Sequence, residues 1–318
     1  MRIAVLTSGG DAPGMNAAIR AVTRTGIYKG MEVFGVQRGY LGLMNGDFIK
    51  LNSRSVGSIL STGGTILLTA RAPEFKTREG IQKAIHSLKK NSIDALVVIG
   101  GNGSQTGAYY LHKEGIPVVG IASTIDNDVF GTQRTIGFDT ALNNAVGAID
   151  KIRDTATSHQ RVFVVEVMGR NRGILALNCG IAVGADAIII PEKTFNIPEL
   201  SIRIKENFER GKKHFIVVLA EGAAKADKFA DALYLLDRIE ASVSVLGYIQ
   251  RGGNPTFEDR FLATNFGVKA VEMVEEKKFG VVVGITNNEI SLIDMKKVAN
   301  GIKPINEKLF DVQKYLSI

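Results

Sequence analysis

Two aspartates lie two residues apart in the segment STIDNDVFGT (residues 123–132), directly after the apolar run PVVGIA (117–122). Asp126 and Asp128 therefore stand in a predicted loop at the end of a buried strand. The pair suggests a general base beside a carboxylate that faces a metal, which a kinase needs next to its acceptor hydroxyl. The alternative interpretation is a solvated turn, because Asp and Asn are common turn residues.

Four arginines lie at predicted strand ends or in the loops beside them. Arg71 is in TARAPEF, Arg161 and Arg170 flank VFVVEVMG, and Arg251 is in GYIQRGG. Phosphoryl transfer needs such cations around the group that moves. A single arginine is more simply explained as a surface charge, but four beside glycine-rich loops favour anion binding.

Two glycine-rich loops, SGGDAPGMN (8–16) and GNGSQTG (101–107), also follow predicted strands. The first precedes a helix whose N-terminal amides could face a phosphate, and both loops are also compatible with a simple tight turn. The second loop is one residue away from G-x-G-x-x-G, and the P-loop motif does not occur. Phosphate loops usually have a carboxylate nearby that organises Mg²⁺, whereas this one holds the neutral Asn102.

Short β-branched runs alternate with amphipathic segments along most of the chain. Eight runs are predicted to be buried strands: residues 2–7, 65–70, 95–100, 117–122, 161–168, 187–191, 215–222 and 280–286. Between 138 and 152 the apolar residues recur at i, i+3 and i+4, which predicts a helix. Alternating strands and helices predict parallel sheets with ligands at the carboxyl ends of the strands. We expect two domains joined by more than one crossover.

The composition narrows the class of protein. Of 318 residues 45% are hydrophobic, which is enough for large cores, and the one cysteine, Cys179, excludes an internal disulfide framework. No apolar run reaches about 18 residues, so we expect a cytoplasmic protein without membrane contact. The net charge of +7 comes from scattered Lys and Arg. This pattern favours small phosphorylated metabolites over nucleic acid.

Eight segments together resemble the bacterial-type ATP-dependent 6-phosphofructokinase family: TSGGDAPGMNAAIRA, GGNGS, TIDND, IGFDTAL, DTATSHQR, VMGRNRG, LAEG and GYIQRGGNP. The resemblance implies an α/β fold of two αβα (Rossmann-like) domains with mainly parallel sheets, each discontinuous in sequence. The nucleotide-binding domain would span 1–137 plus about 252–302. The sugar-phosphate domain would span 138–251 plus about 303–318, and the enzyme would be a homotetramer.

The resemblance implies ATP-dependent phosphorylation of fructose 6-phosphate at its 1-hydroxyl, a glycolytic step with Mg²⁺ as cofactor. Asp126 would be the base, and Thr124, Arg170 and Arg71 would complete the catalytic set. The nucleotide phosphates would be surrounded by Gly10, Arg71, Ala72, Gly101, Asn102, Gly103 and Ser104. Asn102 and Asp128 would face the metal.

The resemblance also implies a sugar site and an effector site. The sugar phosphate would contact Thr124, Ile125, Asp126, Arg161, Met168, Gly169, Arg170, Glu221, Tyr248 and Arg251, with Arg161 supplied by a neighbouring subunit. ADP or phosphoenolpyruvate would bind at Arg20, Arg24, Arg54, Arg153, Asp186, Lys212, Lys213 and His214. Without the resemblance, a solvated basic turn would be the preferred interpretation of residues 212–214.

Three positions depart from the family. Asn102 replaces an Asp that organises Mg²⁺, so we expect a weakened metal site. Ser242 replaces an arginine that binds the 6-phosphate across a subunit interface, and Tyr248 replaces a His. Pyrophosphate-using relatives carry Asp and Lys where this chain has the small Gly103 and Ser123, which favours ATP as the donor.

Two other functions stay open. The altered phosphate-binding residues are compatible with a paralogous sugar-phosphate kinase that takes a different acceptor. A non-catalytic regulatory subunit is a second alternative, although such a protein would not need to keep Asp126, Arg71 and Arg170. The near match to G-x-G-x-x-G makes a nicotinamide-dependent oxidoreductase a distant further option.

Overall fold

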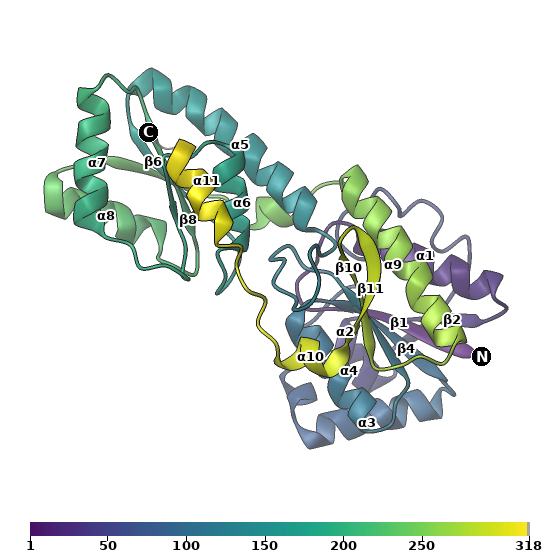
Figure 1. Cartoon of the computed structure of the whole chain (residues 1–318). Coiled ribbons are helices and arrows are strands. Elements are labelled where there is room, and N and C mark those ends of the chain that lie inside the picture. Colours follow the sequence, from purple (N-terminus) through teal and green to yellow (C-terminus); the bar gives the residue numbers. More distant parts are fainter. Residues whose placement is uncertain (317–318) are drawn as a thin grey trace. The chain divides into compact units, whose positions relative to one another are not determined.

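The computed structural model describes residues 1–316, which form two compact units (Figure 1). Unit 1 comprises Met1–Thr140 and Arg251–Lys303, and unit 2 comprises Ala141–Gln250 and the segment from Pro304 onward. The chain thus passes between the units three times. That unit 1 binds nucleotide and unit 2 binds the sugar phosphate stays a prediction at this point.

Unit 1 is built on a seven-stranded sheet with the order β11-β10-β5-β4-β1-β2-β3. The inner five strands run parallel, and the edge strands β3 and β11 are antiparallel to their neighbours. The strands are β1 (Arg2–Ser8), β2 (Glu32–Val36), β3 (Phe48–Leu51), β4 (Ala95–Gly100), β5 (Val118–Ala122), β10 (Val281–Thr286) and β11 (Glu289–Asp294). Every residue of β4 and β5 is buried, as expected for a parallel sheet covered on both faces.

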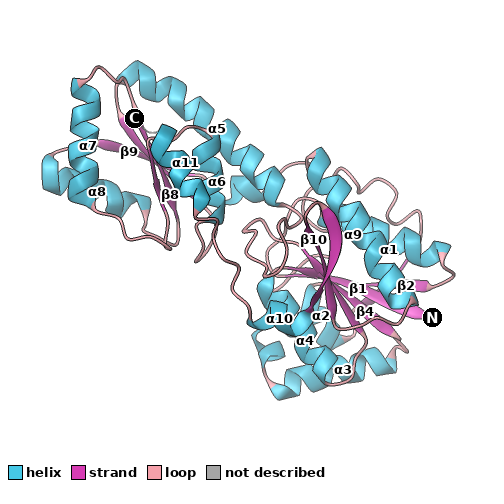
Figure 2. Ribbon diagram, viewed as in Figure 1, coloured by secondary structure: helices cyan, strands magenta, loops and turns pink. Residues whose placement is uncertain are grey.

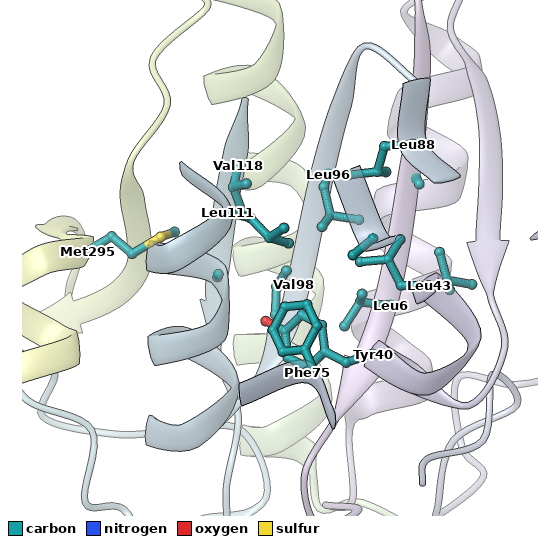
Figure 3. Packing of buried hydrophobic residues seen from close by; sticks show 14 of the residues in the cluster. Leu6, Tyr40, Leu43, Phe75, Leu88, Leu96, Val98, Leu111, Val118 and Met295 are labelled. Atoms are coloured by element: carbon teal, nitrogen blue, oxygen red, sulfur yellow. The ribbon is translucent and has the colours of Figure 1, made fainter. Parts of the chain in front are cut away.

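Helices cover both faces of this sheet (Figure 2). They are α1 (Met15–Tyr28), α2 (Gly39–Asn45), α3 (Arg78–Lys90), α4 (Asn102–Lys113), α9 (Phe257–Glu275), α10 (Met295–Asn300) and the 3₁₀ turn η1 (Pro73–Lys76). On the α2, α3, α4 and α10 face, Tyr40 and Phe75 stack with ring centroids 4.0 Å apart beside Leu6 and Val98 (Figure 3). This core packs against β1 and β4, the two strands that lead into the glycine-rich loops.

Unit 2 is built on a four-stranded parallel sheet with the order β7-β8-β6-β9. Its strands are β6 (Val162–Val167), β7 (Ala187–Ile189), β8 (Phe215–Ala220) and β9 (Ala241–Val245). Its helices are α5 (Phe138–His159), α6 (Ile174–Ala182), α7 (Ile197–Glu209), α8 (Ala226–Asp237), α11 (Lys308–Leu316) and the 3₁₀ turn η2 (Gly247–Arg251). Phe215, Phe229 and Leu233 are among the side chains of its core.

The predicted α/β class with mainly parallel sheets is confirmed, and the helix predicted from residue 138 extends to His159. The strand predicted at 65–70 is wrong, because this segment is a loop. There Leu68 has a φ of 60° and the Thr7 hydroxyl donates to its carbonyl, so side-chain bonds replace a strand ladder. Within residues 1–316 no helix is long and apolar enough to cross a membrane.

The sequence prediction also missed four strands: β2, β3, β9 and β11. β3 and β11 are edge strands with exposed or half-buried positions, and β9 (ASVSV) alternates apolar residues with serine. These segments therefore lack the continuous apolar run that marks a strand buried on both faces.

Candidate active site

Three loops meet at the carboxyl ends of the adjacent strands β1, β4 and β5. A Cβ placed on Gly9 would lie 3.2 Å from the hydroxyl oxygen of Ser104, and one on Gly101 would lie 3.1 Å from the Cβ of Thr124. The loops therefore contact one another directly, and the glycines permit that approach. The structure thus brings the two predicted glycine-rich loops together with the aspartate loop.

The second glycine-rich loop opens directly into α4. Gly101 precedes the helix, whose first turn carries no acidic side chain, so its amides and dipole favour an anion there. The hydroxyl of Tyr40 donates to the carbonyl of Ser104 at 2.5 Å. Burial raises the pKa of Tyr40, so this phenol stays a neutral donor. No motif indicated Tyr40, which fixes the first turn of α4 from the core.

The aspartate loop is held by its own side chains. Asp126 is only 3% exposed, and its amide donates to the Thr124 hydroxyl at 3.2 Å. The Thr135 hydroxyl donates to the Thr124 carbonyl at 2.6 Å. Asn127, at a φ of 50°, completes the turn by donating from its amide nitrogen to the loop backbone. Ile125 is buried, so only its backbone is available to a ligand.

A hydrogen bond joins Asn102, in the second glycine-rich loop, to Asp128, in the aspartate loop. The Asn102 amide nitrogen donates to the backbone carbonyl of Asp128 at 3.1 Å, which directs the amide oxygen away from that bond. This oxygen is buried and has no hydrogen-bond partner. An orphaned amide oxygen next to a carboxylate residue fits the oxygen preference of Mg²⁺. Residues 1–316 contain no cluster of three or more His, Cys, Asp or Glu suited to a metal. That Asn102 and Asp128 hold Mg²⁺ stays a prediction.

Arg71 lies at the end of the loop that replaces the predicted strand. Asn16, buried in α1, accepts from the Ile66 amide at 2.8 Å and donates to the Gly63 carbonyl at 3.0 Å. The Thr69 hydroxyl donates to the Gly9 carbonyl at 2.8 Å. The Arg71 loop is therefore bonded to the first glycine-rich loop, while the Arg71 side chain itself is exposed.

Arg251 also lies in unit 1. A Cβ placed on Gly10 would be 3.0 Å from the guanidinium carbon and from both terminal nitrogens of Arg251. The guanidinium group is therefore packed flat against Gly10, in the loop that follows β1.

In unit 2, the side chains of Gln250 and Glu221 bond the backbone of the segment that follows β6. The amide of Met168 donates to the side-chain oxygen of Gln250 at 2.8 Å. The amides of Gly169 and Arg170 donate to one carboxylate oxygen of Glu221, at 3.1 and 2.8 Å. Gly169 and Arg170 both have positive φ, of 144° and 52°, and Arg170 is exposed. Gln250 is fully buried and was not predicted.

The other predicted sugar-site residues of unit 2 lie at its surface. Arg161 is exposed just before β6, and Tyr248 in η2 is 80% exposed. Ser242 is half-buried in β9, opposite Phe163 of β6. Because β6 and β9 run parallel from Val162 and Ala241, Arg161 lies before the start of this strand pair and Tyr248 after its end.

Comparison with known proteins identifies the family. A model described as phosphofructokinase matches residues 2–274. An ATP-dependent 6-phosphofructokinase of Listeria monocytogenes serotype 4a (strain HCC23) is 54% identical over 317 residues, covering 100% of this chain and 99% of its own. One of Shouchella clausii (strain KSM-K16) is 53% identical over the same shares. The chain belongs to the phosphofructokinase family.

Solved phosphofructokinases have the same fold. The Saccharomyces cerevisiae enzyme matches with a TM-score of 0.85 and 40% identity, over 100% of this chain and 48% of that one. The Pichia pastoris phosphofructokinase in the T-state matches with a TM-score of 0.88 and 38% identity, over 99% of this chain and 36% of that one. A pyrophosphate-dependent phosphofructokinase of Marinobacter aquaeolei, at 23% identity and a TM-score of 0.85, shares the fold over 99% of this chain and 91% of its own.

The effector residues predicted from the phosphofructokinase resemblance fall into two groups. In unit 1, Arg20 and Arg24 lie on α1, and Arg24 donates to the Ser53 carbonyl at 3.5 Å, beside Arg54. Burial and the charge of Arg24 lower the pKa of Arg20. Two neighbouring cations held this way suit an anion.

In unit 2, the buried Asp186 is at the centre of the second group. One of its oxygens pairs with Lys212 and the other accepts from the Ile216 amide at 2.6 Å. Arg153 donates to the Val183 carbonyl, and the ring of His214 bonds the Thr157 hydroxyl at 3.0 Å, whereas Lys213 is exposed. Burial lowers the pKa of His214, which is therefore neutral at pH 7. Whether this group binds an effector stays a prediction.

Proposed function

We propose that this phosphofructokinase transfers the γ-phosphoryl group of ATP to the 1-hydroxyl of fructose 6-phosphate in glycolysis. We further propose Mg²⁺ as its cofactor, the cytoplasm as its location and a homotetramer as its active form. The observation that carries the proposal is the buried Asp126 in a loop that contacts the second glycine-rich loop, which in turn contacts the first. The full-length relatives named ATP-dependent 6-phosphofructokinase support it.

Unit 1 would bind the nucleotide and supply the base. The phosphates would lie against Gly10 and the first turn of α4, with Arg71 reaching them from its loop. The Asp126 carboxylate would take the proton of the 1-hydroxyl as that oxygen attacks the γ-phosphorus, and the bond to the β–γ bridging oxygen breaks to release ADP. Because Thr124 and Thr135 hold the loop, the base would need no rearrangement to act.

Mg²⁺ would be held by the side chains of Asn102 and Asp128 together with the phosphates, and would neutralise charge on them. Asn102 supplies an oxygen without a charge. Two unit charges about 4 Å apart interact by roughly 4 kcal/mol at an effective dielectric near 20, which bounds what the neutral amide gives up. We therefore propose that the protein needs more Mg²⁺ than relatives with an Asp there.

Unit 2 would bind the sugar phosphate. Glu221 and Gln250 fix the backbone of Met168, Gly169 and Arg170. We propose that the Arg170 side chain stabilises the transferring phosphoryl group. Arg161 and Tyr248 are exposed. Each is therefore accessible to a sugar phosphate bound by its own subunit or by a neighbouring subunit.

The donor is proposed to be ATP. A Cβ placed on Gly103 would meet no atom within 4 Å, so the space beside the α4 N-terminus is open and can receive a nucleoside. An Asp at this position, as in pyrophosphate-using relatives, would fill that space with a negative charge. ADP or phosphoenolpyruvate is proposed as the effector.

A second candidate function rests on the acceptor side. Ser242 is half-buried in β9 and carries no charge, so unit 2 has lost one cation for the 6-phosphate. A paralogous kinase with another sugar phosphate as acceptor would explain this substitution.

The test is to incubate the purified protein with Mg-ATP and a panel of sugar phosphates while following ADP release. We expect turnover with fructose 6-phosphate to exceed that with the other sugars. Faster turnover with another acceptor would establish the paralogue instead, and no turnover with any acceptor would make the chain a non-catalytic subunit.

A further inference from the structure

We infer that Arg251 binds the phosphate chain of the nucleotide, in addition to its predicted contact with the sugar 6-phosphate. This inference rests on the proposed function, which places those phosphates at Gly10. It gives Arg251 a role in unit 1 that its sequence context, GYIQRGG, did not suggest.

The first argument is the position of the guanidinium group. It lies flat against the Cα of Gly10, because a Cβ there would be 3.0 Å from three of its atoms. Gly10 belongs to the loop that follows β1 and precedes α1, and a hydroxyl from the Arg71 loop bonds its neighbour Gly9. A planar fork of donors at this loop is suited to bind phosphate oxygens bidentately.

The second argument is the anchoring of the Arg251 backbone. Gly63 is packed so tightly on Gly253 that a Cβ at Gly63 would overlap the Gly253 carbonyl oxygen. Gly63 in turn is held by the buried Asn16 at 3.0 Å. The segment that carries Arg251 is therefore fixed to the same loop that carries Arg71. Only one residue earlier, the Gln250 side chain is bonded within unit 2.

The third argument is charge. A nucleotide triphosphate carries about four negative charges, and its site in this chain has the neutral Asn102 where the metal is held less firmly. Cationic side chains would then balance the phosphate charge that the metal does not neutralise. Arg251 at Gly10 supplies one such cation.

The experiment compares Arg251→Gln with the unchanged protein by isothermal titration calorimetry. Each is titrated with the β,γ-imido analogue of ATP in MgCl₂ without sugar, and separately with fructose 6-phosphate alone. A hydrogen bond to a charged group contributes about 1.5–3 kcal/mol, so we expect nucleotide binding to weaken roughly 10–150-fold. Arg210→Gln is the matched control, because Arg210 is exposed directly after α7 in unit 2 and its replacement removes the same charge from a different unit.

A double-mutant cycle tests the location. Gly10→Ala places a methyl group against the guanidinium, which is the flexible end of a side chain and is able to move aside. If Arg251 binds the phosphates at Gly10, the losses from Gly10→Ala and Arg251→Gln are less than additive. Melting temperatures of the variants show that the fold is kept.

The outcomes separate this inference from the proposed function. A protein that binds the analogue equally well after Arg251→Gln, and loses only fructose 6-phosphate, overturns the inference and leaves the proposed function intact. Additive losses in the cycle also overturn it. An unchanged protein that binds no analogue overturns the proposed function and the inference together.

Discussion

The two units hold their functional residues in different ways. In unit 1 the Asp126 loop and both glycine-rich loops are packed against one another, with Asp126 buried and Tyr40 bonded to the first turn of α4. In unit 2 the backbone around Gly169 is fixed by Glu221, whereas the Arg161 and Tyr248 side chains lie at the surface. We infer that unit 1 is preorganised, whereas unit 2 is completed by a ligand or a neighbouring chain.

The most severe test of preorganisation is Asp126→Asn. We expect kcat to fall roughly 10²–10⁴-fold, the usual range for a positioned general base, with little change in nucleotide affinity. ADP release and nucleotide titration measure the two quantities. Asp231→Asn on the exposed face of α8 is the matched control. Full turnover in Asp126→Asn would remove Asp126 from the mechanism.

Asp259 tests the rigidity of unit 1 through pH. It is 1% exposed, and its carboxylate accepts from the amides of Gly137 and Thr140 at 2.7 and 2.8 Å, which holds the start of α5. Burial nevertheless raises its pKa from 3.8 to about 6. The stability it contributes is present below about pH 4 and is lost as pH rises through about 6, which amounts to about 3 kcal/mol.

The amide in Asp259→Asn does not titrate, so this variant does not lose stability as the pH rises through the pKa of Asp259. Relative to the unchanged protein, we expect its melting temperature to rise between about pH 4 and pH 6 and to stay constant above that range. Thermal denaturation at several pH values measures the difference. A difference that is constant with pH would show that Asp259 is ionised to the same extent in the folded and unfolded chain.

The exposed Arg161 tests whether unit 2 is completed by a neighbour. Arg161→Gln alone should weaken fructose 6-phosphate binding roughly 10–150-fold. If Arg161 serves a neighbouring site, mixed oligomers of Arg161→Gln and Asp126→Asn chains regain part of the activity, because an intact Asp126 meets an intact Arg161. The assay is activity after unfolding and refolding the mixture, with each variant refolded alone as control. No recovery in oligomers shown to be mixed would contradict a shared site.

Ser242→Arg restores a cation to the sugar-phosphate unit. We expect the KM for fructose 6-phosphate to fall, by up to the roughly 10–150-fold of one charged hydrogen bond, with little change in kcat. Steady-state kinetics separate these effects, and Ser244→Arg, on the same strand, is the control. Tight binding by the unchanged protein, with activity abolished in Ser242→Arg, would mean that the site is rebuilt around Ser242.

Asn102→Asp should have the smallest effect. It adds a charge beside the nucleotide phosphates but removes the hydrogen bond from the Asn102 amide to the Asp128 carbonyl. We expect the Mg²⁺ concentration for half-maximal activity to fall only a few-fold. A magnesium titration of activity measures it, with the exposed Asn52→Asp as control. Unchanged Mg²⁺ dependence would place the metal elsewhere.

The sequence was most informative where neighbouring residues decide the structure. The buried strands and the Asp126 loop were predictable because apolar runs and turn residues are local signals. Asn16, Asp259 and Gln250 were not, since their partners lie 50, 119 and 82 residues away. A polar residue inside a helix or turn looks solvated until the fold buries it against such a partner.

The position of Arg251 was unpredictable for a related reason. Its motif indicates an anion ligand, but the Gly10 contact arises only because the chain returns to unit 1 at that residue. This contact is a structural observation, whereas the roles of the site residues stay predictions.

Because the chain passes between the units three times, unit 1 is completed only late in synthesis on the ribosome. α1 packs on α9 so closely that a Cβ at Gly267 would lie 2.5 Å from the Cβ of Ala21. At about 5–20 residues per second, α9 emerges roughly 10–50 s after α1. The whole sheet of unit 2 is synthesised in that interval. Until β10 and α9 are synthesised, the first strands of unit 1 leave the β5 edge unpaired and one apolar face uncovered, and such an edge is prone to pair with other chains.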